Sequence, residues 1–402
     1  MRCLILGKVW PEPSSTAAGQ RICDLISALS VAGWELSFAS AAQAGEYAVD
    51  LAIYGVASHA ISVNDPAFDA WVAELEPDVV VFDRFMTEEQ FGWRVAEHCP
   101  EALRVLDTSD LHCLRLARQA QMESGGVLQL KNETAIREVA AIYRSDLTLM
   151  ISEFEIELLR REFSIPETLL AYWPFPISLP DAFPGFAARQ NFIMIGSLQH
   201  APNLDAARWC QQAIWPQIRS ALPEAELHCF GSYGAKYAGE LNQPDRGFHF
   251  KGRAGNALQT MSGYRVNLAP LRFGAGLKGK VFDGFLSGTP TVMTPIAAEG
   301  IFVESHWAHE SIDAFVDEAV ALYTDPARWQ SRQGEGQAVC RERFAASRWR
   351  QQLPERLRLA HDQRARHREA NFVGQMLRHH QHRSTEFLSR WIEAKNKLKG
   401  SV

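Results

Sequence analysis

Short apolar runs alternate with helical patterns along most of this chain of 402 residues. The runs are rich in β-branched residues and have no polar face, and Asp78–Phe82 is the clearest of them. Strands of this kind lie in parallel sheets that helices cover on both faces. The predicted fold class is therefore α/β with parallel strands.

The alternation is interrupted once, in Ala171–Pro184, which contains four prolines within eleven residues. Proline cannot continue a helix or a central strand, so we interpret this stretch as a linker between two α/β domains. After Ile312 the pattern is mostly helical and the alternation does not continue. The predicted division is an N-terminal α/β domain at 1–170, a linker at 171–186, a C-terminal α/β domain at 187–340, and a basic helical extension at 341–402 that returns toward the N-terminal domain.

The predicted elements follow directly from these patterns. In the first half we expect strands at Cys3–Leu6, Trp34–Ala39, Asp50–Tyr54, Asp78–Phe82, Leu103–Leu106 and Leu147–Ile151, and helices at Gly19–Leu29, Leu111–Met122 and Glu153–Phe163. In the second half we expect strands at Asn191–Ile195, Glu226–Phe230, Gly247–Lys251, Arg265–Ala269 and Thr291–Thr294, and helices at Asp205–Ala213, Ala257–Gly263 and Val281–Ser287.

Composition excludes several other classes of protein. Hydrophobic residues make up 47% and charged residues 22% of the chain, as in an ordinary globular protein. The seven cysteines are scattered without CxxC spacing, which favours reduced thiols in a cytoplasmic protein. The chain has no apolar run of about 18 residues, so we expect no membrane span, and any membrane contact would be peripheral, at the inner face.

The segment Ala269–Pro290 carries the most chemistry. It places a glycine-rich turn, Lys278, Lys280 and Asp283 between a predicted strand and a predicted helix. Glycines let a backbone approach a ligand closely, and a helix N-terminus favours anions. The pattern therefore indicates a site for a nucleotide diphosphate, and the alternative is a tight turn with solvated lysines.

Three motifs resemble the nucleotide-sugar glycosyltransferases of GT-B architecture, the mostly retaining "group 1" family. Asp283–Val292 is similar to the helix "EAMAxGxPVV", and Phe192–Ala207 is similar to "FxGxxxHxPNxDA". Gly252 follows a predicted strand as in "FxGxV". The resemblance implies two Rossmann-like domains that face a cleft, an acceptor domain at 1–170 and a nucleotide-sugar donor domain at 187–340, plus the helical extension.

The same resemblance implies a function. The chain is expected to transfer a sugar from a nucleotide-diphosphate donor, such as a UDP- or GDP-sugar, to an acceptor hydroxyl, with retention and without a metal or cofactor. Two departures stand out, because the family keeps a pair of glutamates here. The second is the shorter Asp283, and the first is replaced by Ala275. We expect Lys278, Lys280 and the loop amides to hold the diphosphate instead.

The predicted donor-binding residues are Gly196, His200, Asn203, Gly274, Ala275, Gly276, Leu277, Lys278, Lys280, Asp283 and Glu299. Asp283 would accept hydrogen bonds from the ribose, with a helix-terminal acid as the alternative role. Glu299 would lie near the sugar or the nucleotide. Asn203 and Asp205 have an alternative role as caps of the helix at Asp205–Ala213.

In the first half, candidate residues follow three predicted strands. Gly19 and Arg21 open a helix after the first loop, and Arg21 would reach a phosphate unless it is a surface arginine. Asp83 and Arg84 are weaker acceptor-side candidates. We predict Asp110 and His112 as catalytic residues, since a histidine there can bind a sugar hydroxyl or relay the acceptor proton. The alternative for Asp110 is a helix N-cap.

The tail is basic: residues 331–402 carry a net charge of +9, whereas residues 1–330 carry −15. It would pack on the N-terminal domain, bind an anionic membrane or lipid-linked acceptor, or bind RNA or another polyanion. A metal site at His379, His380 and His382 is the weakest reading, because the fourth ligand is undefined. The acceptor, a glycan, a lipid-linked saccharide or another molecule, is open. Alternatives for the whole chain are a sugar-nucleotide epimerase on the same fold, or a non-catalytic sugar-nucleotide binder.

Overall fold

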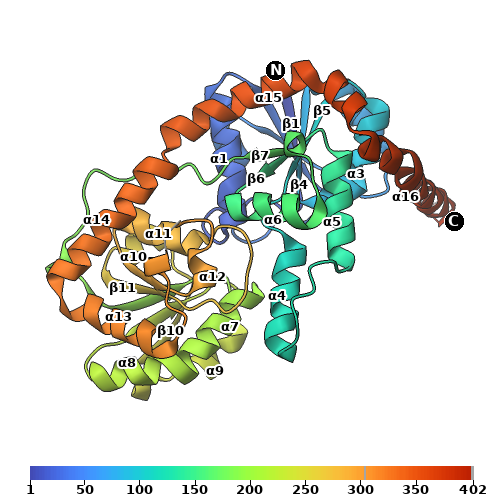
Figure 1. The fold of residues 1–402 in the computed structure, drawn as a ribbon. Coiled ribbons are helices and arrows are strands. Elements are labelled where there is room, and N and C mark those ends of the chain that lie inside the picture. Colours follow the sequence, from blue (N-terminus) through green and yellow to red (C-terminus); the bar gives the residue numbers. More distant parts are fainter. Residues whose placement is uncertain (303–304, 400–402) are drawn as a thin grey trace.

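The computed structural model describes residues 1–302 and 305–399, and they form two parallel sheets joined by an extended segment (Figure 1). The first sheet has the strand order β3-β2-β1-β4-β5-β6-β7, and the second has the order β10-β9-β8-β11-β12. Two Rossmann-like halves and a C-terminal helical extension are thus present, which confirms the predicted fold class.

The first half contains seven strands in the described residues: β1 Arg2–Gly7, β2 Glu35–Ser40, β3 Ala57–Ala60, β4 Val79–Asp83, β5 Leu103–Asp107, β6 Leu147–Met150 and β7 Leu170–Tyr172. Its helices are α1 Ala17–Val31, η1 Leu51–Tyr54, α2 Ala67–Leu75, α3 Phe85–His98, α4 His112–Ser124, α5 Glu133–Arg144, α6 Glu153–Phe163 and the short η2 Glu167–Leu169. Strands β4, β5 and β6 are buried at every position, as expected for a sheet covered on both faces.

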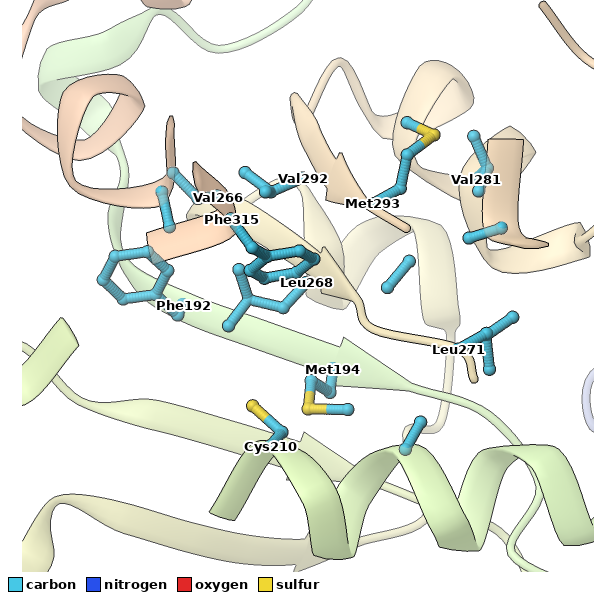
Figure 2. Close-up of a cluster of buried hydrophobic side chains, with 14 of the residues drawn as sticks. Phe192, Met194, Cys210, Val266, Leu268, Leu271, Val281, Val292, Met293 and Phe315 are labelled. Atoms are coloured by element: carbon cyan, nitrogen blue, oxygen red, sulfur yellow. The ribbon is translucent and has the colours of Figure 1, made fainter. Parts of the chain in front are cut away.

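The second half contains β8 Gln190–Ile195, β9 Leu227–Phe230, β10 Phe248–Gly252, β11 Tyr264–Ala269 and β12 Thr291–Met293. Its helical segments are η3 Phe186–Ala188, α7 Ala201–Trp209, the π-helical η4 Cys210–Ile214, α8 Trp215–Ala221, η5 Ala235–Tyr237, α9 Ala238–Leu241, η6 Pro244–Arg246, α10 Ala257–Met261, α11 Gly279–Ser287, α12 Pro295–Ala298, η7 Ser305–Trp307, α13 Ile312–Thr324 and α14 Pro326–Arg343. Figure 2 shows the core around this sheet, where Phe192, Val266 and Leu268 pack against Phe315 of α13.

The last two helices return from the second half to the first (Figure 1). Helix α15, Ala346–Ala370, buries Trp349, Leu353 and Leu357 in the core of the first half. Helix α16, Phe372–Lys399, follows it and packs against α3 and α5. No helix in the described part of the chain is long and apolar enough to cross a bilayer.

Three local predictions need correction. Asp50–Tyr54 is not a strand, because the Asp50 carboxylate accepts a hydrogen bond from Ala52 N and starts a 3₁₀ turn, and the strand follows at β3. Helix α7 begins at Ala201, four residues before the predicted start. The predicted linker overlaps the end of β7, which pairs with β6.

The order of strands reverses between β1 and β4 in the first sheet and between β8 and β11 in the second. In open parallel sheets the loops at the carboxyl ends of such strands diverge and leave room for a ligand. The loops after these four strands contain most of the residues predicted from the sequence.

Candidate functional site

A pocket lies at the carboxyl ends of β8 and β11, between the loop after β8 and the start of α11. Gly196, Asn203, Pro270 and Lys280 are among the residues that line it. Lys280 Nζ donates to Asn203 Oδ1 at 2.7 Å, and Asn203 Nδ2 donates to the carbonyl of Ser197 at 2.9 Å. The structure therefore brings the two predicted motifs of the second half together around one cation.

Gly196 has a structural reason to be glycine. Its φ is 157°, and a Cβ added there would lie 2.7 Å from Asn203 Nδ2. A side chain at this position would therefore push Asn203 away from Lys280. Asn203 lies within α7 and is not its cap. Asp205 is not a cap either, because it pairs with Arg272, whose Nε lies 2.9 Å from Asp205 Oδ2.

The loop Gly274–Leu277 is packed against the first half, which corrects part of the prediction for its amides. Gly276 N donates to Glu155 Oε1 at 2.7 Å, and the same oxygen accepts from Leu111 N at 3.1 Å. A Cβ on Gly276 would lie 2.9 Å from Asp110 Cβ. The Gly276 amide is thus already bonded to Glu155 and cannot also bind a diphosphate in this arrangement.

The two predicted lysines lie in different surroundings. Lys278 is buried, and its Nζ donates to the carbonyl of Gly276 at 2.6 Å and lies 3.9 Å from Glu299 Oε1. Burial lowers the pKa of Lys278, while Glu299 opposes that change. Lys280 is among the residues that line the pocket, whereas Lys278 is bonded to the Gly276 carbonyl.

Glu299 is engaged by an arginine of the first half. Arg118 Nη1 lies 2.8 Å from Glu299 Oε1 and Arg118 Nη2 lies 2.6 Å from Glu299 Oε2, a bidentate pair. Arg118 Nη1 also donates to the carbonyl of Gly274 at 2.8 Å. The carboxylate predicted to lie near the sugar thus serves as a bridge between the two halves.

Asp283 lies one turn into α11 and is half-buried. Burial raises its pKa to about 7, against the opposing charge of Lys280. Burial and the neighbouring Lys278 lower the pKa of Lys280 to about 8. The two side chains therefore change charge within about one pH unit of each other.

In the first half, the loop after β5 and the start of α4 hold Asp110 and His112. Asp110 Oδ2 accepts from Arg115 Nε at 2.8 Å, and Asp110 Oδ1 lies 3.3 Å from His112 Nε2. Burial alone would raise the pKa of Asp110, but the hydrogen bond from His112 and the charge of Arg115 bring it well below its usual range. Asp110 is therefore an anion that orients the imidazole.

Asp110 does not cap α4, because Glu138 of α5 does so. The Glu138 carboxylate accepts from His112 N at 2.8 Å and from Cys113 N at 2.7 Å. The backbone at this edge of the sheet is also strained. Arg84 and Ser109 have φ values of 69° and 58°, which non-glycine residues adopt rarely and mainly where function demands it.

His200 connects the two sides of the cleft electrostatically. It is the N-cap residue of α7, and it is exposed. Desolvation within the cleft lowers its pKa to about 4, the charge of Asp110 opposes this, and Arg115, Lys280 and Arg84 add to it. His200 is thus a neutral imidazole among charged groups from both halves.

For three predicted residues of the first half, Arg21, Asp83 and Gly19, the structure gives a different role from the one that was expected. Arg21 is buried and donates from Nε to Asp107 Oδ1 at 2.8 Å and from Nη1 to the carbonyl of Trp173 at 2.9 Å, so it cannot reach a phosphate. Asp83 is buried beneath the cleft edge and accepts from Lys8 N at 3.0 Å. Gly19 makes room for the chain's own Glu12 backbone, which a Cβ would approach to 2.5 Å.

Further contacts that the sequence did not suggest join the two halves. Tyr233 OH donates to the Glu12 carboxylate at 2.9 Å, and Arg253 Nη2 donates to Ser14 Oγ at 2.9 Å. Arg115, Arg118 and Glu155 were missed as well. Arg115 and Arg118 are three residues apart and therefore share one face of a helix, and this spacing is the feature of the sequence that could have identified them. Their partners depend on how the halves dock, which no local pattern encodes.

The comparisons with known proteins agree with this arrangement. Residues 189–325 match the profile of the family described as Glycosyl transferases group 1. The resemblance recognised from the motifs and the enzyme class, a glycosyltransferase, are thereby confirmed. A comparison with curated protein sequences gave no match.

Solved structures resemble nearly the whole chain. A sucrose-phosphate synthase from Thermosynechococcus elongatus is 14% identical with a TM-score of 0.67, covering 89% of this chain and 98% of its own. Anabaena HepE, solved with UDP and glucose, is also 14% identical with a TM-score of 0.67, covering 89% and 99%. The lipopolysaccharide outer core galactosyltransferase WaaB is 13% identical with a TM-score of 0.57, covering 88% and 98%. At these identities the similarity shows the fold.

Proposed function

We propose that this glycosyltransferase moves a sugar from a nucleotide-diphosphate donor to an acceptor hydroxyl, with retention at the anomeric carbon and without a metal. The observation that carries the proposal is the pairing of Lys280 and Asn203 in the pocket at the carboxyl ends of β8 and β11, together with the pairing of Asp110 and His112 in the first half. A cation in the donor pocket and an oriented imidazole across the cleft are the two parts that such a transfer requires.

Each of these groups has a distinct role in the proposal. Lys280 neutralises the charge that develops on the leaving diphosphate, which is the role a metal ion has in other transferases. Asp283 accepts hydrogen bonds from the ribose. His112, held by Asp110, binds a hydroxyl of the donor sugar or relays the acceptor proton. Gly276 and Lys278 do not touch the donor, because they are bonded to Glu155 and to each other.

A uridine nucleotide is the first donor to test. HepE, which shares the fold, was solved with UDP and glucose. Incubation of this chain with a panel of UDP- and GDP-sugars should release the nucleoside diphosphate when an acceptor is present. Isomerised donor without release would indicate an epimerase, and binding without either product would indicate a non-catalytic protein. The anomeric configuration of the product, read by NMR, tests retention.

We further propose that the basic tail binds anionic membranes, where a lipid-linked acceptor would lie. Exposed apolar side chains follow one face of α16 at helical spacing: Phe372, Met376, Phe387, Trp391 and Leu398. The opposite face packs on the first half, where Asn371 and Arg378 donate to the carbonyls of Tyr143 and Arg144. An apolar stripe on a basic helix fits a membrane interface. The side chains of His380 and His382 lie outside the described part.

Vesicle sedimentation tests this placement. Phosphatidylglycerol vesicles should retain the wild-type chain and release the double variant Phe387→Ser, Trp391→Ser, whereas phosphatidylcholine vesicles should bind neither well. Equal retention of both proteins would contradict the proposal. Turnover with a water-soluble acceptor should be the same in both, which separates the tail from the transfer itself.

A further inference from the structure

A second cluster of chemically active side chains lies away from the cleft, at the amino-terminal ends of β9 and β10. His228 is the second residue of β9, and His249 is the second residue of β10. The register of the sheet places these two histidines side by side. Glu226 lies two residues before His228, and its carboxylate contacts both rings.

The three side chains converge on a small space. His228 Nε2 lies 2.9 Å from Glu226 Oε2, and His249 Nε2 lies 3.5 Å from Glu226 Oε1. One ligand atom from each residue can be chosen so that all three lie within 4.8 Å of one another. A zinc ion bonds such nitrogens and oxygens at about 2.0–2.2 Å, so small side-chain rotations suffice to enclose it.

Two details indicate that these atoms are arranged for a ligand. His249 Nε2 is buried and has no hydrogen-bond partner in the described residues, although a buried ring nitrogen normally finds one. His228 Nδ1 lies 2.6 Å from Tyr264 OH. A hydrogen bond of this kind with Tyr264 holds the His228 ring in place and leaves His228 Nε2 directed toward Glu226. The charge of Lys251 acts on Glu226 and His228 from the same strand as His249 and weakens the site somewhat.

We propose that Glu226, His228 and His249 bind a divalent transition-metal cation, with zinc as the first candidate. Two imidazoles and one carboxylate suit zinc, and water would complete the coordination. The cation would join the edge strand β10 to β9. The donor pocket lies at the carboxyl ends of the strands, so the cation stabilises the second half and takes no part in the transfer.

The test is zinc binding to the full chain in which His379, His380 and His382 are replaced by glutamine, which removes the competing cluster of the tail. Calorimetry should find one equivalent of zinc, and zinc should raise Tm, because a ligand of the folded state alone stabilises it. His228→Ala and His249→Ala should abolish this binding. Tyr264→Phe should weaken it about tenfold, the usual cost of losing an outer partner.

Two further variants separate the loss of a zinc ligand from a loss of folding. Glu226→Gln retains hydrogen bonding but removes the negative charge, so it should fold normally, by circular dichroism, and bind zinc at least tenfold more weakly. His361→Ala, on α15, should bind zinc as the parent does. The proposal fails if the parent binds no stoichiometric zinc, or if the binding survives His228→Ala, and the latter result would point to another site. Release of nucleoside diphosphate should not depend on zinc, so this outcome is separate from that of the proposed transfer.

Discussion

The two halves of the molecule build their sides of the cleft by different means. In the second half, Gly196 and Asn203 follow β8 by one and eight residues, Lys280 follows β11 by eleven, and each belongs to a motif that the sequence shows. In the first half, Asp110 and His112 depend on Arg115, Glu138 and a strained backbone. A site made of local segments can be read from a motif, whereas a site held by distant partners cannot. The predictions that follow test this contrast.

The largest expected effect concerns the buried pair Arg21–Asp107 beneath the first-half cleft. Both side chains are almost fully buried, so Arg21→Ala leaves an uncompensated carboxylate and should lower the free energy of unfolding by about 3–5 kcal/mol. Urea unfolding measures the change. Arg208→Ala removes an exposed pair with Glu240 and should cost about 1 kcal/mol or less. Equal losses in the two variants would contradict a structural role for Arg21.

The next effect separates chemistry from donor binding. His112→Ala should lower kcat/KM by about 10²-fold or more, the usual contribution of a proton-transferring group. The Kd for UDP should stay within about twofold, because His112 is not among the residues that line the donor pocket. Steady-state kinetics and calorimetry on the same preparation measure both quantities. A variant that lost UDP binding and turnover together would place His112 on the donor side.

A third prediction concerns Glu155, which joins the two halves. Burial, with Asp110 adding, raises its pKa to about 8, and the amides of Leu111 and Gly276 oppose this. Because the pKa is raised on folding, the stabilisation from this group is complete below about pH 4.5 and is lost as pH rises through about 8. The variant Glu155→Gln keeps an oxygen that accepts these hydrogen bonds, but its side chain does not ionise.

The variant should therefore gain roughly 1–3 kcal/mol over the wild type between pH 5 and pH 9, as thermal unfolding would show. Identical pH dependence of Tm in the two proteins would mean that Glu155 is ionised at all these pH values. Glu153→Gln, which alters an exposed pair two residues away, is the matched control.

The smallest predicted effect is on the pH profile of kcat/KM. Asp283 must be ionised to accept from a ribose, so activity should rise through about pH 7, and Lys280 must be protonated, so activity should fall above about pH 8. On each side of the maximum, kcat/KM should change about tenfold per pH unit. Asp283→Asn should remove the acid limb and Lys280→Met the alkaline limb. A flat profile between pH 6 and pH 9 would contradict both assignments.

Much of the fold could be predicted from the sequence, because the buried strands are continuous apolar runs and the prolines after Tyr172 stop the pattern. The exceptions have local causes. Asp50 binds its own backbone and makes a turn of an expected strand. Helices α3 and α5 were missed, and Glu88 of α3 pairs with Arg144 of α5 in the interior.

The candidate site divides in the same way. Asn203 and Lys280 were predicted from motifs, and the structure joins them. Lys278 and Arg21 carry the same charge as Lys280, and the sequence could not show that Gly276 O, Asp107 and Trp173 O hold them inside. The bridge from Arg118 to Glu299 needs both halves in place. Charge and spacing in the sequence identify candidate binding residues. Which candidates are exposed to a ligand depends on burial, and burial depends on partners that are distant in the sequence.

The most direct test of the central claim is UDP binding by calorimetry to the wild type, Lys280→Ala and Lys278→Ala. If Lys280 holds the diphosphate, Lys280→Ala should raise Kd at least tenfold, which is about 1.4 kcal/mol. Lys278→Ala should change Kd less, because Lys278 is bonded to the Gly276 carbonyl. An unchanged Kd in Lys280→Ala, with a loss of binding confined to Lys278→Ala, would contradict the assignment of the donor pocket.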